Sequence, residues 1–268
     1  MRIFPALFVA IFLSYILFHI SSKNNFFLPG INPGGFWHWF SALFLMDGFV
    51  LPYLRVINIT WTLVVEIVFY IMTFIYIAKS KTSPIKANWY MIIFWVVLAL
   101  LSMKMSFFAG NATIIKFIAF LLIGRTIYLW YTKLISIADS LLCFTLIIFV
   151  FCLFAEYSSP GYLLLAGYEP AASYVLAVGI FMGMLRLSPK RVMQPFKFFG
   201  NISYSLYLFH LPVGMFVLNI LYLKHVSASL SSIIAIAISI VVATISYYLI
   251  ELPSQRLARK LVVKRREL

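Results

Sequence analysis

Residues 58–70 read NITWTLVVEIVFY, an apolar run that carries one carboxylate, Glu66, in its interior. From Trp61 the apolar character continues to residue 78, close to the roughly 20 residues that a helix needs to cross a bilayer. Thr62, Glu66 and Tyr70 recur at every fourth position and would share one face of that helix. Ionisable groups are costly in lipid, so Glu66 is a candidate functional residue, with a hydrogen-bond anchor between helices as the alternative.

The whole chain has the composition of a membrane protein. Of its 268 residues, 64% are hydrophobic and 10% are charged, and the mean hydropathy is +1.03. Soluble domains are about half apolar and about one quarter charged. Because unpaired backbone groups are not tolerated in lipid, the long apolar runs should be helices. We predict an all-α polytopic membrane helix bundle of about eight transmembrane helices, at residues 3–20, 61–78, 89–107, 113–131, 136–155, 170–187, 200–223 and 227–250. The aromatic stretch 36–53 is broken by Asp47, Gly48 and Pro52 and is predicted to be interfacial or re-entrant.

The basic residues indicate an orientation. The formal charge of +14 comes from 21 basic and 7 acidic residues, and most of the basic residues lie in short clusters between apolar runs. With a cytoplasmic N-terminus, most of them fall on the cytoplasmic side, which places both termini in the cytoplasm. No nucleic-acid partner is expected. Residues 1–250 are predicted to be the transmembrane domain and 251–268 a basic cytoplasmic tail that lies on the membrane as an amphipathic helix. Glu251 is expected to cap this helix or to pair with Arg256. Cys143 and Cys152 lack the spacing of a metal site.

A second polar constellation lies in FFGNISYSLYLFHLPVG, residues 198–214. Ser203, Tyr207 and His210 are spaced to form one polar stripe on an apolar helix, with Tyr204 beside it. Pro212 and Gly214 would permit a break in the helix just beyond His210. A neutral imidazole in the membrane is a candidate general base, and a histidine that only packs helices is the alternative.

One further cation falls inside a predicted span. Arg125, in LLIGRTIYLW, lies near the cytoplasmic end of its helix. It is expected either to snorkel to the surface or to pair with a phosphate or a carboxylate.

Three stretches, in this order, resemble the integral-membrane O-acyltransferases of acyltransferase family 3. RIFPALFVA at 2–10 is similar to the family's Arg-Ile-x-Pro, and WTLVVEIVFY at 61–70 to its Trp-Ser/Thr-Leu-x-x-Glu-x-x-Phe-Tyr. FGNISYSLYLFHLPV at 199–213 is similar to its Gly-x-Ile-Ser-Tyr-Ser-Leu-Tyr-Leu-x-His. The tail IELPSQRLARKL at 250–261 resembles the family's closing acidic-x-Pro and basic pattern.

The resemblance implies a bacterial inner-membrane enzyme that moves an acyl group, usually acetyl, from acyl-CoA to a hydroxyl of a carbohydrate or lipid-linked glycan. It implies no metal. Glu66 and His210 would be catalytic. Substrate-binding positions would be Trp61, Ser203, Tyr204 and Tyr207, and the donor would meet Arg2 and Arg125, whose guanidinium groups suit its phosphates.

The sequence departs from the family pattern in one respect. Members usually begin with two further spans, the first carrying an Arg and a His eleven positions apart, which are the favoured catalytic pair. None of the 4 histidines here follows an Arg at that distance. The sequence leaves three interpretations open: a misplaced start site, a truncated and inactive remnant, or another group that acts as the base. A membrane transporter or flippase is the rival function, since Glu and His within spans can relay protons.

Overall fold

The computed structural model describes residues 3–23, 35–46, 56–104, 112–158, 171–187 and 194–264. Within these ranges the chain is helical and forms no strand, as its composition predicts. The elements in chain order are α1 (Ile3–Lys23), α2 (Phe36–Leu43), η1 (Asn58–Thr60), α4 (Trp61–Ile75), α5 (Ile77–Thr82), α6 (Pro84–Lys104), α8 (Ala112–Tyr131), α9 (Ile137–Ser158), α10 (Ala171–Leu187), α11 (Gln194–Leu223), α12 (Ala228–Ser246), η2 (Tyr247–Glu251) and α13 (Leu252–Lys264).

The predicted helical membrane bundle is confirmed. In the described part of the chain, 6 helices are long and apolar enough to cross a membrane, namely α1, α6, α8, α9, α11 and the helix that begins with α12. The other two predicted spans correspond to shorter apolar helices, Trp61–Ile75 and Val175–Leu185. The predicted span 61–78 ends early, because a turn at Tyr76 separates α4 from the short basic helix α5.

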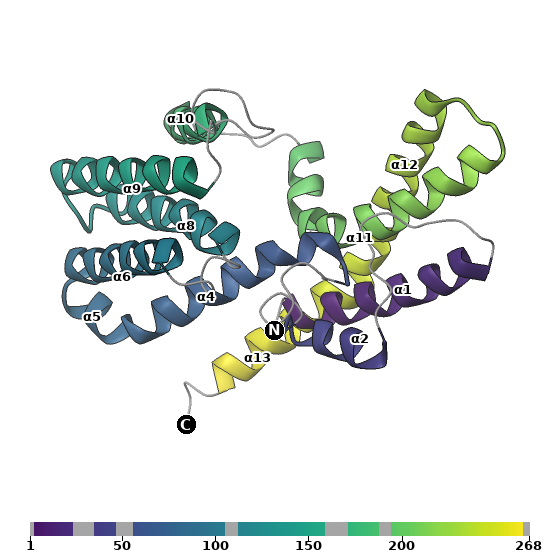
Figure 1. The fold of residues 1–268 in the computed structure, drawn as a ribbon. Helices are drawn as coiled ribbons and strands as arrows, with labels where there is room; N and C mark the ends of the chain where they lie inside the picture. Colours follow the sequence, from purple (N-terminus) through teal and green to yellow (C-terminus); the bar gives the residue numbers. More distant parts are fainter. Residues whose placement is uncertain are drawn as a thin grey trace. The chain divides into compact units, whose positions relative to one another are not determined.

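The chain divides into two compact units, and each is described by itself. The first unit combines Met1–Trp61 with Lys190–Leu268. Its centre is the hairpin of α11 and α12, against which α1 packs, while α2 packs on α1 (Figure 1). Ala6, Leu7 and Ala10 of α1 and Leu208 and Phe209 of α11 are all buried. Large apolar side chains remain exposed on the outer faces of the same helices, as expected where lipid is the solvent.

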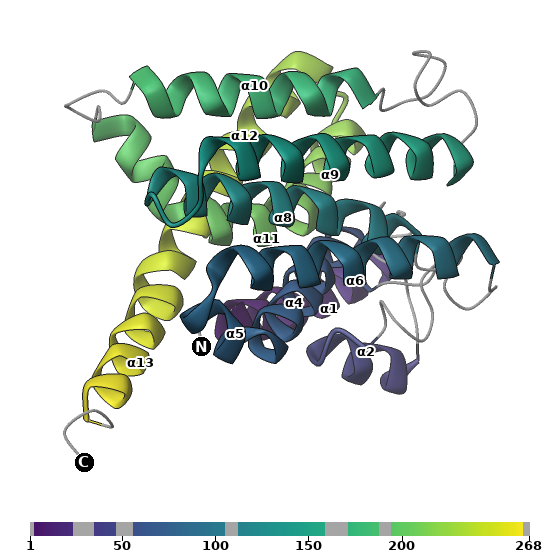
Figure 2. The ribbon, with the colours of Figure 1, turned by 90° about the vertical axis from the view of Figure 1, so that its left-hand side faces the viewer.

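The second unit, Thr62–Pro189, is a stack of helices. Figure 2 shows α6, α8, α9 and α10 running across the view one above another. Trp95 of α6 is buried and its Nε1 donates a 2.8 Å hydrogen bond to the carbonyl oxygen of Ile115 in α8. Asn88 of α6 is also buried, and its Nδ2 donates to Thr126 Oγ1 of α8 at 3.0 Å and to Cys143 Sγ of α9 at 3.5 Å. Polar contacts therefore join three apolar helices at one point.

The end of the chain is helical up to Lys264. A π-turn, η2, connects α12 to α13 without interrupting the helix. The short helix α2 covers the start of the stretch that was predicted to be interfacial or re-entrant. Residues 47–55, which hold Asp47, Gly48 and Pro52, lie outside the described residues.

Candidate functional site

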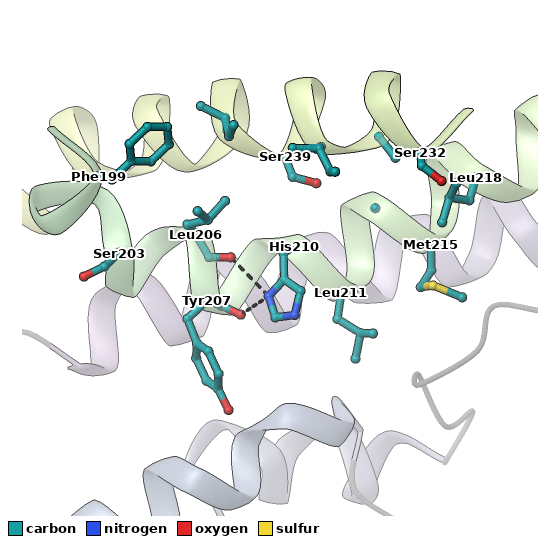
Figure 3. A pocket seen from close by; sticks show the side chains of 14 residues that line it. Phe199, Ser203, Leu206, Tyr207, His210, Leu211, Met215, Leu218, Ser232 and Ser239 are labelled. Atoms are coloured by element: carbon teal, nitrogen blue, oxygen red, sulfur yellow. Dashed lines mark hydrogen bonds between the residues drawn. The ribbon is translucent and has the colours of Figure 1, made fainter. Parts of the chain in front are cut away.

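Helix α11 carries Ser203, Tyr207 and His210 along one face, as their spacing predicts. All three line an open groove of about 980 Å³ between α11 and α12. The remaining lining is apolar except for Ser232 and Ser239, which α12 contributes from the opposite wall (Figure 3). An apolar groove with a few convergent polar groups is the usual form of a small-molecule site.

The imidazole of His210 is held by its own helix. Its Nδ1 lies 2.7 Å from the carbonyl oxygen of Tyr207 and 3.3 Å from that of Leu206 (Figure 3). A carbonyl oxygen can only accept, so we assign the proton to Nδ1. Nε2 then carries the lone pair, and the ring is exposed in the groove. The arrangement gives the groove a proton acceptor of fixed orientation.

The two hydroxyl groups beside His210 are engaged by backbone. Tyr207 donates a 2.8 Å hydrogen bond to the carbonyl oxygen of Ile59, and Ser203 donates at 2.9 Å to that of Gly200. The Tyr207 ring lies 5.9 Å from that of His210, centroid to centroid. Tyr207 therefore ties α11 to η1 as well as lining the groove, and its oxygen can still accept a hydrogen bond.

Helix α11 does not break where the sequence permits it. Pro212 lies inside a continuous helix, and the chain remains helical through Gly214. A Cβ at Gly214 would lie 3.5 Å from Ser239 Oγ, so the two helices approach closely here. The facing side of α12 is a stripe of small buried residues at Ser231, Ala235, Ser239 and Ala243. Small residues permit such close packing between membrane helices, and their spacing of four was a signal that the sequence analysis did not use.

The other predicted site residues lie elsewhere. Tyr204 is half-buried on α11, outside the residues that line the groove. Glu66 is half-buried on α4, one residue after the buried Val65, and Trp61 is half-buried where that helix begins. Because Glu66 belongs to the second unit and His210 to the first, their sharing of one pocket stays a prediction. Arg2 lies outside the described residues.

Arg125 is half-buried on α8, and the structure gives it a neutral partner. Its Nη2 donates a 2.9 Å hydrogen bond to Ser80 Oγ of α5. Its Nε is buried and has no hydrogen-bond partner among the described residues. An Nε–H without a partner can still donate to an anion, and pairing of Arg125 with a phosphate or a carboxylate stays a prediction.

Glu251 does not cap a helix, which was one of the two expectations from the sequence. Its side chain is fully buried, and it lies in the π-turn η2 within a continuous helix. Ser205 Oγ donates to its Oε2 at 2.9 Å, and Gln255 Nε2 donates to its Oε1 at 3.0 Å. The other expectation, a pair with Arg256, stays a prediction. Ser205 lies between Ser203 and Tyr207 in sequence but faces away from the groove. Its position between them is the sequence signal that α11 has a second polar face.

A second cavity of about 600 Å³ lies between α1 and α2. Aromatic rings form most of its wall, including Tyr15 and Trp39, whose ring centroids are 5.1 Å apart in an edge-to-face contact. His19 is its most polar member, and its Nδ1 lies 3.1 Å from the carbonyl oxygen of Tyr15. Such a wall is typical of aromatic residues at a membrane interface.

Fold and site together define an integral-membrane helix bundle with a histidine-bearing groove. The model of the family described as Acyltransferase domain, acyltransferase family 3, matches residues 1–251. The chain therefore belongs to this family and is a membrane acyltransferase in general terms. No curated protein and no solved structure matches the chain significantly.

Proposed function

We propose that the protein transfers an acetyl group from acetyl-CoA to a hydroxyl of a carbohydrate or lipid-linked glycan, in a bacterial inner membrane. The observation that carries the proposal is the geometry of His210, whose Nδ1 is bound to backbone carbonyl oxygen and whose exposed ring lines the groove. The family match supports acyl transfer. The identities of the donor, the acyl group and the acceptor go beyond the family match and are part of the proposal.

The proposed reaction is direct transfer without an acyl-enzyme. Nε2 of His210 takes the proton of the acceptor hydroxyl as that oxygen attacks the thioester carbonyl. The carbon–sulfur bond then breaks, and the imidazolium returns the proton to the departing CoA thiolate, so that protons and electrons balance. In this scheme Glu66 orients the acceptor or stabilises the imidazolium. Trp61, Ser203, Tyr204 and Tyr207 contact the substrates, and Arg2 meets the donor.

The groove suits an acceptor with an apolar part. Leu206, Leu211, Met215 and Leu218 of α11 line it beside His210. A lipid carrier could lie against these side chains while its sugar hydroxyl reaches Nε2. An apolar wall also excludes water, which strengthens hydrogen bonds to the reacting atoms and limits hydrolysis of the thioester.

The test is acetyl incorporation by the full-length chain in membranes supplied with radiolabelled acetyl-CoA. His210→Ala should lower label in the glycan fraction by about 100-fold, the scale of a lost general base. His225→Asn is the matched control, because His225 lies in the turn after α11 with φ 56° and Asn accepts that conformation. Near-normal incorporation by His210→Ala would refute the base role.

One feature of α11 bears on the rival function, a transporter or flippase. A broken helix at a midplane site is typical of many transporters, but α11 continues through Pro212. Vesicle flux measured beside label incorporation separates the two functions. Movement of lipid-linked glycan without acetylation would favour the transporter.

A further inference from the structure

Arg125 is a cation with an incomplete set of partners inside an apolar helix stack. Ser80 is the one hydrogen-bond partner that the described residues give it, and this partner carries no charge. The Nε atom of Arg125 is buried and has no hydrogen-bond partner among the described residues. A half-buried guanidinium in apolar surroundings is stabilised when an anion neutralises it. The geometry therefore calls for an anionic group, and the described residues give Arg125 no such hydrogen-bond partner.

The charged residues near Ser80, the partner of Arg125, are basic. Ser80 lies between Lys79 and Lys81 on α5, and both lysines are exposed. Lys86, also exposed, lies in the first turn of α6, which packs against α5. Figure 2 shows α5 beside the start of α6. From residue 67 to residue 138 the sequence has no Asp or Glu, so no carboxylate of this segment can balance these four cations.

We propose that Arg125 and Ser80, flanked by Lys79, Lys81 and Lys86, form a binding site for a phosphate ester. The guanidinium offers parallel N–H donors that match two phosphate oxygens, which an ammonium does not. The Ser80 hydroxyl fixes the guanidinium plane and can donate its own proton to a third oxygen. The lysines raise the local concentration of anions and add contacts whose strength falls with salt.

Two sources of phosphate fit this chemistry, the nucleotide part of the acyl donor and the headgroup of an anionic lipid. The first deepens the proposed function, because it assigns to α5 and α8 the phosphate end of acetyl-CoA. The site itself does not depend on acyl transfer, so it can be tested without turnover. By the charge distribution along the sequence, this end of α8 lies on the cytoplasmic side, where both sources are present.

The experiment uses the purified full-length chain in nanodiscs of zwitterionic lipid, titrated with adenosine 3′,5′-bisphosphate by calorimetry. This probe carries phosphates of CoA and no thioester. Arg125→Gln should weaken its binding by about 10-fold to 100-fold, the scale of a charge-assisted hydrogen bond, and Ser80→Ala should weaken it several-fold. Lys197→Ala removes an exposed lysine of α11 in the other unit and is the control. If Arg125→Gln does not fold, Lys79→Gln combined with Lys81→Gln tests the same site from its exposed side.

A second arm identifies a lipid source. In nanodiscs that contain phosphatidylglycerol, native mass spectrometry should then count more retained anionic lipid on the wild type than on Arg125→Gln. Loss of either ligand in the variant supports the phosphate site, and equal nucleotide affinity together with equal lipid retention overturns it. Acetylation that depends on His210 while Arg125→Gln binds normally would leave the proposed function standing without this site. If Arg125→Gln loses binding but acetylation does not depend on His210, the phosphate site stands and the proposed function does not.

Discussion

Ser205 Oγ donates a 2.9 Å hydrogen bond to Oε2 of Glu251, across 46 residues of sequence. The contact joins α11 to the π-turn between α12 and α13. Both side chains are fully buried. A buried carboxylate is tolerated when its oxygens are hydrogen-bonded, and Gln255 serves the other oxygen at 3.0 Å. Short π-helical segments inside α-helices are rare and often lie at functional sites.

Removal of the Ser205 hydroxyl should therefore destabilise the first unit. Ser205→Ala leaves a buried carboxylate with one donor fewer, at a cost of about 1–3 kcal/mol. The apparent melting temperature of the detergent-purified protein measures the effect. Ser203→Ala, two positions away on an exposed part of the same helix, is the matched control. If the two variants have the same melting temperature, the hydrogen bond from Ser205 to Glu251 does not stabilise the unit.

The close approach of α11 to α12 makes a second prediction. Gly214 is buried, and an added Cβ would already be in van der Waals contact with Ser239 Oγ at 3.5 Å. Gly214→Ala should therefore be tolerated, whereas Gly214→Leu must push the helices apart and cost about 1–3 kcal/mol. Gly200→Leu is the control on the same helix, since its Cβ meets nothing within 4 Å. A Gly214→Leu protein that melts like the Gly200→Leu protein would show that the hairpin packs more loosely than described.

The helical fold could be predicted because lipid leaves the backbone few choices. Each predicted apolar run contains a helix in the part that the structure describes, and the spacing of Ser203, Tyr207 and His210 placed them on one face. Helix ends were less predictable. Tyr76 is apolar enough to continue a span, yet the turn there frees α5 to place Ser80 against Arg125.

The site was harder to predict, since long-range contacts have no local signature. Nothing beside Tyr207 in the sequence shows that its hydroxyl bonds to the backbone of Ile59, 148 residues away. Glu251 is an acidic residue before a proline and a basic tail, a pattern typical of a surface cap. In the fold, Ser205 and Gln255 contact its carboxylate and its side chain is buried. Pro212 misled for a related reason, because a proline in a long helix is tolerated where its surroundings satisfy the freed carbonyl.

A third prediction concerns the polar contact among α6, α8 and α9. Thr126 Oγ1 accepts from Asn88 Nδ2 and donates to the carbonyl oxygen of Leu122 at 2.9 Å. Thr126→Val keeps the shape and removes both bonds, so the free energy of unfolding should fall by about 0.6–1.7 kcal/mol, the range for hydrogen bonds between membrane helices. Thr145→Val, exposed on α9, is the control. Equal unfolding of the two variants in a detergent titration would contradict a stabilising role for the Asn88 contact.

The last prediction tests the proton acceptor without any substrate. With Nδ1 bonded to the carbonyl of Tyr207, neutral His210 should be the Nδ1-protonated tautomer. Solid-state NMR of protein labelled with ¹⁵N-histidine in lipid bilayers distinguishes the two ring nitrogens by chemical shift, and His210→Gln identifies which signal belongs to this residue. Adding a soluble glycan acceptor should then perturb the unprotonated Nε2 resonance and leave that of His225, in the turn after α11, unchanged. If His210 instead carries its proton on Nε2, that nitrogen can donate a proton but cannot accept one, and another group must take the proton from the acceptor hydroxyl.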